Sequence, residues 1–334
     1  PRGRRHVLRD YRVSLTTHRR IADTSLVLLW LIVVTGATVR LTQSGLGCPD
    51  WPSCHGSHPV PQLSYHPLIE FANRMVTTPV LLASLATWWS ARRLAVRRPD
   101  LRRFSGLVVL GVLAQAVIGG ISVRLHLTPV MVSIHFLVSM LILMAASWVS
   151  FAARRPGVVR LRVQERNLGG TTRTGAGTAA MTRAAVIVML TCAATVIVFG
   201  VLTTASGPHS GGLPEQNVQR FGDGGLMVML HARLGFTFFA IAVGLTLWHR
   251  RTRAGARDMT LLTALTVVQI ALGEYQYRNG LPWRIVLAHV ATATALWIVT
   301  CMIAWNSLSK PAAVPHDGDR VILPTPDRSI SSAV

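Results

Sequence analysis

Eight long apolar runs alternate with short polar stretches along the 334-residue chain. A helix needs roughly 20 residues, at ~1.5 Å each, to cross a hydrocarbon core of ~30 Å, and each run is about that long. Half of all residues are hydrophobic, which is typical of polytopic membrane proteins. The pattern therefore predicts an all-α membrane protein with eight transmembrane helices, at 21–40, 67–90, 105–124, 130–152, 183–204, 226–248, 260–278 and 283–305.

One set of residues occurs twice at the same spacing. Gln115, Gly119, Arg124 and His135 return, in the same order and register, as the set Gln269, Gly273, Arg278 and His289. This indicates an internal duplication with four spans per copy. Because an even number of spans separates the copies, both insert in the same orientation. We expect two tandem four-helix bundles with pseudo-twofold symmetry along the membrane normal.

The basic residues predict the orientation in the membrane. Lys and Arg number 34 against 13 Asp and Glu, a net charge of +21, and the arginines precede span one or follow spans two, four and six. Positive residues stay cytoplasmic, so both termini are expected inside and the loops after the odd-numbered spans outside. Topology accounts for the charge, which argues against nucleic-acid binding. The first run has no small-residue cleavage site before its loop, so we expect it to remain as an anchor.

Composition divides the chain further. We expect a cytoplasmic tail at 1–20, the first bundle at 21–152 and the second at 183–305. The basic stretch 153–182 is rich in Gly and Thr and cannot bury apolar surface, which is typical of a flexible cytoplasmic linker. The proline-containing segment 306–334 is expected to be a disordered cytoplasmic tail.

Each even-numbered span carries a ligand-type side chain near its outer end: Asn73, His135, His231 and His289. Polar groups inside a membrane are costly and usually functional. Histidines from facing helices are good axial ligands for haem iron. The alternative is a histidine that only bonds a neighbouring helix. A metal without a porphyrin is disfavoured, because no acid or cysteine near His231 and His289 completes a tetrahedral shell.

The two copies differ in a way that predicts different roles. His231 and His289 would saturate an iron, which suits a resident electron-transfer haem. The first copy offers only His135, with Asn73 in the second place, and leaves a coordination position open near the carboxylate of Glu70. Glu70, Asn73 and Arg74 share one helical face. We therefore place the chemistry in the first copy, with a plain Glu70–Arg74 ion pair as the alternative.

Two further groups belong to the outer side. Arg74, Arg124 and Arg278, together with Arg40, are candidates to pair with haem propionates, although arginines also anchor helices at the interface. Cys48 and Cys54 lie in the outer loop after span one, where the compartment favours oxidation. We expect a disulfide between them, either structural or redox-active.

The motifs together resemble those of the haem A synthase family, in an actinobacterial form. The residues that carry the resemblance are the loop from Arg40 through Ser44-Gly45-Leu46, Cys48-Pro49-Asp50-Trp51-Pro52 and Cys54, then Glu70-x-x-Asn73-Arg74, His135, Ser206-Gly207-Pro208-His209, His231 and His289. Members oxidise the C8 methyl of haem O to the formyl of haem A, for cytochrome c oxidase. The resemblance implies a bacterial plasma-membrane enzyme with haem b on His231 and His289, and with haem O as substrate near His135 and Glu70.

The resemblance also implies partners, namely membrane lipid, haem O synthase and cytochrome c oxidase assembly factors. Two positions depart from the family pattern. The family's Glu-x-x-His-Arg reads Glu70-x-x-Asn73-Arg74 here, and the loop at 205–225 lacks the second cysteine pair of some members. The sixth ligand opposite His135, the electron donor or acceptor, the source of the formyl oxygen and a homo-oligomeric state stay open.

Two other functions fit the same histidines. A dihaem b-type electron carrier that oxidises quinol would use them as ligands, but such proteins usually stack haems toward opposite membrane faces, and here every candidate ligand lies toward one side. A haem transporter or chaperone built on a parallel repeat would instead line a path with them.

Overall fold

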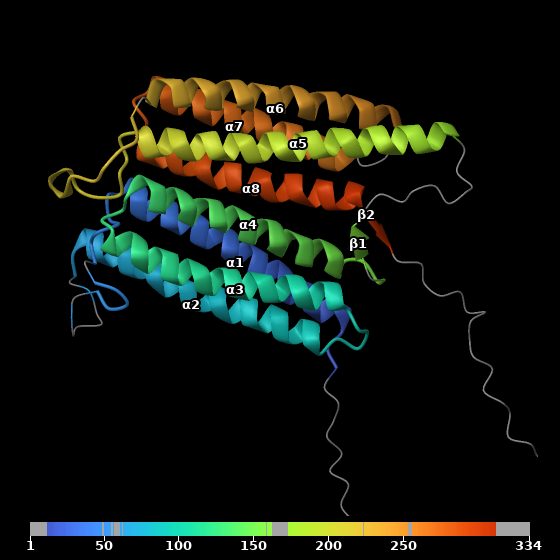
Figure 1. Ribbon diagram of the computed structural model, residues 1–334, viewed down its shortest axis with the longest axis horizontal. Coiled ribbons are helices and arrows are strands. Elements are labelled where there is room, and N and C mark those ends of the chain that lie inside the picture. The colour runs from blue at the N-terminus through green and yellow to red at the C-terminus, as the bar shows by residue number, and fades with distance from the viewer. Residues whose placement is uncertain are drawn as a thin grey trace, which may run out of the picture.

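The computed structural model describes residues 12–48, 50–54, 56, 61, 63–157, 159–161, 173–222, 224–252 and 256–311. These residues form eight α-helices, one for each predicted span (Figure 1). Their bounds are α1 Leu15–Leu41, α2 Tyr65–Arg92, α3 Pro99–Arg124, α4 Pro129–Ala153, α5 Arg173–Ser206, α6 Gly224–Thr252, α7 Ala256–Arg278 and α8 Trp283–Leu308. A short 3₁₀ helix, η1 (Pro214–Gln216), precedes α6, and the strands β1 (Val159–Leu161) and β2 (Ser309–Pro311) pair antiparallel.

Local sequence accounts for several helix starts. The Ser14 side chain accepts a hydrogen bond from Thr17 N and caps α1. Pro99 and Pro129 occupy the first turns of α3 and α4, where a missing N–H costs nothing. One start differs from the expectation, because α5 begins at Arg173, inside the stretch 153–182 that we predicted as a linker. The domain boundaries stay predictions, and most of 1–20 and 306–334 lies outside the described residues.

The helices are those of a multi-pass membrane protein. Within the described residues, six of them are long and apolar enough to cross a membrane, and α2 and α7 are not among the six. Polar residues interrupt those two helices, namely Thr77, Thr78 and Pro79 in α2 and Gln269, Glu274 and Gln276 in α7. Large apolar side chains face outward along the helices, as lipid contact requires, and Val27, Leu82 and Leu110 are each more than 60% exposed.

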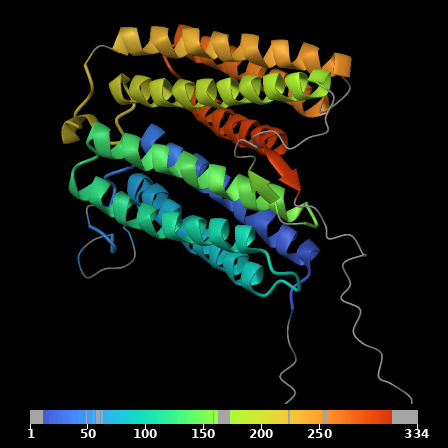
Figure 2. The same ribbon diagram turned by 45° about the vertical axis from the view of Figure 1, so that its right-hand side comes forward.

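The helices pack in two groups of four. In the first group α1 contacts α2 and α4, and α3 contacts the same two helices; in the second, α5 contacts α6 and α8, and α7 contacts the same two (Figures 1 and 2). The groups meet through α8, which contacts α1 and α4, and through α4 and α5. One buried apolar cluster includes residues of all eight helices.

Three tryptophans donate indole N–H hydrogen bonds across the interface between the two helix groups. Trp297 Nε1 donates to the Met140 carbonyl at 2.9 Å, and Trp30 Nε1 donates to the Ala291 carbonyl at 3.1 Å. Trp305 Nε1 donates to Ser147 Oγ at 3.0 Å. A buried indole needs such a partner, so these bonds fix α8 against α1 and α4.

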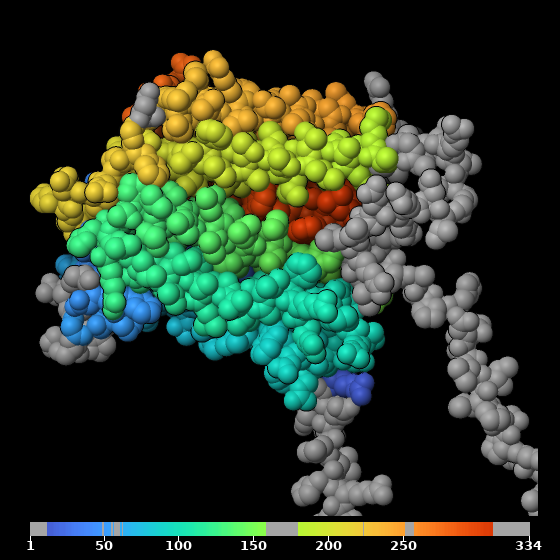
Figure 3. Space-filling view, viewed as in Figure 1, coloured from blue at the N-terminus to red at the C-terminus, as the bar shows by residue number. Residues whose placement is uncertain are grey.

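Loops of the two groups also join at one end of the helices. The Arg40 guanidinium donates to the carbonyls of Thr204 at 2.7 Å and His209 at 3.0 Å, and Gly45 N donates to the Gly211 carbonyl at 2.7 Å. The loops after α1 and α5 therefore lie against each other, at the left in Figures 1 and 3. The candidate residues for chemistry lie on the helices near this end.

Candidate functional site

The structure brings the imidazoles of His231 of α6 and His289 of α8 close together in the second helix group, in an edge-to-face arrangement. Their ring centroids are 6.2 Å apart. Two metal–imidazole bonds of ~2 Å, plus roughly 1 Å from each nitrogen to its ring centre, place the centroids of two axial imidazoles roughly 6 Å apart. The observed spacing matches that requirement, and both residues are half-buried.

Neighbouring groups orient the two rings. His231 Nδ1 donates to the Val196 carbonyl of α5 at 3.0 Å, which leaves Nε2 as the unprotonated nitrogen. Gln269 Nε2 lies 2.9 Å from His289 Nε2, while His289 Nδ1 is buried and has no partner among the described residues. A metal-binding histidine usually donates its second ring N–H, as His231 does to Val196, whereas His289 Nε2 accepts from the Gln269 amide.

Glycines make room for these rings. A Cβ atom at Gly200 would lie 2.9 Å from His231 Cε1, and one at Gly273 would lie 3.2 Å from His289 Cε1. Both contacts are closer than carbon atoms normally approach. Gly200 and Gly273 therefore let α5 and α7 pass directly beside the two imidazoles.

The first helix group repeats part of this arrangement around His135. A Cβ atom at Gly119 would meet His135 Cε1 at 3.5 Å, and His135 Nδ1 is buried without a partner in the described part of the chain. Gln115 Nε2 donates to the His135 carbonyl at 2.7 Å and to Ser139 Oγ, so it fixes the backbone of α4 rather than the ring. His135 and His289 thus share a buried Nδ1 without a hydrogen-bond partner among the described residues.

The side chain of Asn73 is already hydrogen-bonded to a neighbouring helix. Its Oδ1 accepts a hydrogen bond from Thr35 Oγ1 of α1 at 2.7 Å. The amide oxygen, which is the donor atom that asparagine offers a metal, is therefore engaged. Among the candidates in the described part of the first group, only His135 has a buried nitrogen without a hydrogen-bond partner.

Glu70 and Arg74 form a buried ion pair that supports the loop after α1. Arg74 Nη2 lies 2.5 Å from Glu70 Oε1, and Glu70 Oε2 accepts a hydrogen bond from Cys48 N at 2.8 Å. Arg74 also donates to the carbonyls of Asp50 at 2.8 Å and Ser53 at 2.9 Å. The ion pair that we weighed as an alternative role for Glu70 is present, and it grips the loop as well.

The same loop covers the first helix group. Cys48 and Cys54 are joined by the expected disulfide, and both are fully buried. Trp51 lies over α3, where a Cβ atom at Gly120 would come within 2.7 Å of its ring. Trp51 therefore packs the loop against α3, and Glu70 and Arg74 bind it to α2.

The other predicted arginines lie apart from these contacts. Arg124 is exposed, and Arg278 pairs with Glu274 on an exposed face of α7. Arg40 bridges the two groups instead of facing a site. Within the described residues no three His, Cys, Asp or Glu side chains gather as a metal cluster.

Sequence reasoning missed two supporting residues, Thr35 and Val196, and assigned no contact to Gln115 and Gln269. The duplication marked Gln115 and Gln269 as special but did not show that one bonds a backbone carbonyl and the other an imidazole. Thr35 and the Val196 carbonyl carry no motif at all. Only the packing of α1 on α2, and of α5 on α6, reveals them.

Comparisons with known proteins place the chain in a family. A family model described as cytochrome oxidase assembly protein, COX15-CtaA, matches residues 19–301. The chain is similar to the heme A synthase of Lysinibacillus sphaericus, 35% identical over 113 residues, which are 33% of this chain and 36% of that protein. It is also similar to those of Shewanella oneidensis, 31% identical over 131 residues, and of an Exiguobacterium species, 33% over 116 residues. Each of these two matches covers 34% of this chain and 38% of the relative, so the alignments span little more than a third of each relative.

Proposed function

Because the chain belongs to the COX15-CtaA family of cytochrome oxidase assembly proteins, we propose that it is a haem A synthase. Its reaction is the oxidation of the C8 methyl of haem O to the formyl group of haem A, for cytochrome c oxidase. The observation that carries this proposal is the pair of imidazoles of His231 and His289, 6.2 Å apart on facing helices. A haem that transfers electrons needs such a site with two ligands. An enzyme that oxidises haem also needs a second haem site with an open coordination position.

The second helix group fits a resident haem b. His231 and His289 would supply the two axial nitrogens, with the rings oriented by Val196 and Gln269. When bound, haem b would supply one-electron transfer. The close glycines and the 6.2 Å spacing of the ring centroids support this assignment.

The first helix group is the proposed substrate site. His135 would hold the iron of haem O, and Asn73, already bonded to Thr35, would leave the opposite side open. Glu70 would accept a proton as the methyl is oxidised, or stabilise positive charge that develops there. Arg74, Arg124 and Arg278 are the proposed partners of haem propionates, and Arg74 offers the most buried guanidinium of the three.

Two architectural proposals accompany the activity. The helix groups are related by a pseudo-twofold axis along the membrane normal, because the contact of α1 with α8 has its counterpart in the contact of α5 with α4. Both termini face the cytoplasm of a bacterial cell, as the arginine distribution favours. Haem O synthase and cytochrome c oxidase assembly factors are the proposed neighbours, because one supplies the substrate and the others receive the product.

A pyridine haemochrome spectrum of the purified full chain tests the proposal. Haem b together with haem O or haem A supports the synthase. Haem b alone would support the electron carrier, and absence of haem the transporter or chaperone. His289→Ala should remove haem b but leave the other haem, because only the second group loses a ligand. His126→Ala, in the loop after α3, serves as the control and should retain both.

A further inference from the structure

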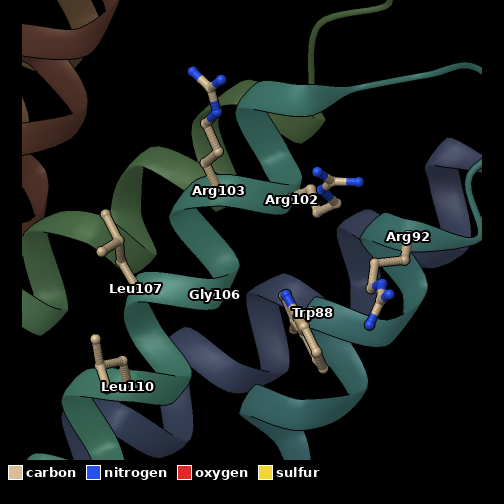
Figure 4. Close-up of a pocket in the computed structure, with 7 residues that line it drawn as sticks. All are labelled: Trp88, Arg92, Arg102, Arg103, Gly106, Leu107 and Leu110. Carbon is tan, nitrogen blue, oxygen red and sulfur yellow. The ribbon is translucent and has the colours of Figure 1, made fainter.

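A basic groove lies between α2 and α3 at the end of the helices opposite Glu70. It is lined by Trp88, Arg92, Arg102, Arg103, Gly106, Leu107 and Leu110 and encloses about 430 Å³ (Figure 4). Trp88 and Arg92 come from the last turns of α2, and the other five residues come from the first half of α3. None of them takes part in the proposed haem chemistry.

The groove carries positive charge without a counter-charge. Arg92, Arg102 and Arg103 are exposed, and within the described residues no carboxylate pairs with any of them. Asp100, the nearby acid of α3, is engaged by Arg98 through bonds of 3.0 and 2.8 Å. Three guanidinium groups with planar N–H forks thus remain available for an anion, and such forks match the oxygens of phosphate as well as those of carboxylate.

The indole of Trp88 forms one wall of the groove. The Arg92 guanidinium lies over its ring, 4.7 Å from the centroid. A Cβ atom at position 106 would come within 3.3 Å of Trp88 Nε1, so Gly106 lets the indole reach α3. Figure 4 shows the indole nitrogen directed toward Gly106, between the two helices. The ring therefore holds one arginine in place and separates the charged end of the groove from its apolar end.

The apolar end continues toward the middle of the helices. Leu107 and Leu110 follow the arginines along α3 and are 54% and 63% exposed. In a multi-pass membrane protein these leucines face hydrocarbon, while Arg102 and Arg103 lie at the polar boundary. A free phosphate would use only the arginines. A phospholipid would use both ends, with its phosphate on the guanidinium groups and an acyl chain along the leucines.

We propose that this groove binds an anionic phospholipid, through the phosphate of its headgroup, in the membrane leaflet at the arginine-rich end. Basic pockets between membrane helices suit such headgroups, and a net negative lipid gains more from three unpaired arginines than a zwitterionic one does. The site is independent of the proposed haem chemistry.

Native mass spectrometry of the purified full chain, titrated with dioleoyl phosphatidylglycerol, tests this site. The matched comparison is Arg102→Gln/Arg103→Gln, inside the groove, against Arg93→Gln/Arg97→Gln, which removes the same charge from exposed neighbours outside it. We expect the first pair to weaken binding about tenfold or more, and the second by less than about twofold. Equal loss in both pairs would show diffuse surface charge and overturn the proposal.

Two further arms define the ligand. Dioleoyl phosphatidylcholine should bind about tenfold more weakly than phosphatidylglycerol, and inorganic phosphate at the same concentration should not displace the lipid. Displacement by phosphate would identify an ion site and refute a lipid site. Gly106→Leu keeps every charge but fills the groove, so it should also weaken lipid binding, and unchanged binding would exclude the cavity. Haem content of each variant reports on folding.

Discussion

The two halves contain the same glutamate–arginine spacing in opposite settings. Glu70 and Arg74 begin α2 with side chains 5% and 16% exposed, whereas Glu274 and Arg278 end α7 with side chains 54% and 73% exposed. An exposed pair typically contributes ~0–1 kcal/mol, while removing one partner of a buried pair costs ~3–5 kcal/mol. Of these two pairs, therefore, only Glu70–Arg74 holds its carboxylate in one fixed, protected place.

The two halves also differ in the number of histidines at the candidate site, and here the second half has more. The second half joins two imidazoles across its centre, and the first half has one, with Asn73 bonded to Thr35 at the other position. The Gln–Gly–His repeat is common to both, so the residues outside it make the difference. A shared scaffold can thus carry a closed site in one copy and a reactive site in the other.

The largest expected effect comes from removing the buried carboxylate. Glu70→Gln should lower haem A formation at least about a hundredfold, because general acid–base groups typically contribute that much or more. Haem b should stay bound, since His231 and His289 are untouched. Haem extraction from cells that express each variant measures both. The matched change, Glu274→Gln, should leave both haems at wild-type levels.

Unchanged haem A in the Glu70→Gln cells would remove Glu70 from the chemistry and leave it only its bonds to Arg74 and Cys48 N. Loss of haem b in the same cells would instead show a folding defect. The two outcomes are distinguishable in one extract, because haem A and haem b separate by chromatography.

The helices were predictable because hydrophobicity determines them. Each apolar run became a helix, and the ends differ mainly at α5, where helix geometry continues back to Arg173 through residues of a Gly/Thr-rich stretch. Periodicity and run length do not report where a membrane helix stops once it leaves the hydrocarbon. The disulfide was predictable from two cysteines that lie close together in one loop between two spans.

The contacts of the site were less predictable than its members. The duplication selected His135 and His289, but whether two rings meet depends on helix rotation, which the sequence pattern leaves free. The reach of Arg74 to the carbonyls of Asp50 and Ser53 depends on how the loop folds back, and no local signal encodes that. The sequence pattern does not distinguish Arg40 from Arg74, Arg124 and Arg278, and only the fold brings the carbonyls of Thr204 and His209 within its reach.

A second, smaller effect should follow from making the halves alike. Asn73→His offers the first half a second imidazole, which would saturate the substrate iron and exclude outside ligands. We expect carbon monoxide binding to the haem of this half to fall about tenfold, whereas haem A formation should continue, because the family pattern itself has histidine at this position. Absorbance difference spectra measure the first and haem extraction the second.

Asn73→Leu is the control for this change, because it loses the Thr35 bond without adding a ligand. It should retain carbon monoxide binding. An equal loss in both variants would mean that the bond between Thr35 and Asn73, rather than the number of ligands, sets the properties of the first half.

The smallest expected effect concerns the loop after α1, which the Glu70–Arg74 ion pair holds in place. Arg74→Lys keeps the charge but replaces the planar fork with a single ammonium, so it loses bonds to the carbonyls of Asp50, Ser53 or Cys48. Each lost bond to a charged group costs about 1.5–3 kcal/mol of local stability. We expect a water-soluble phosphine to reduce Cys48–Cys54 several-fold faster, measured by thiol labelling. Arg154→Lys, whose pair with Asp23 lies on another part of the surface, should reduce at the wild-type rate, and a wild-type rate for Arg74→Lys would show that Trp51 and the loop backbone hold the disulfide without the arginine.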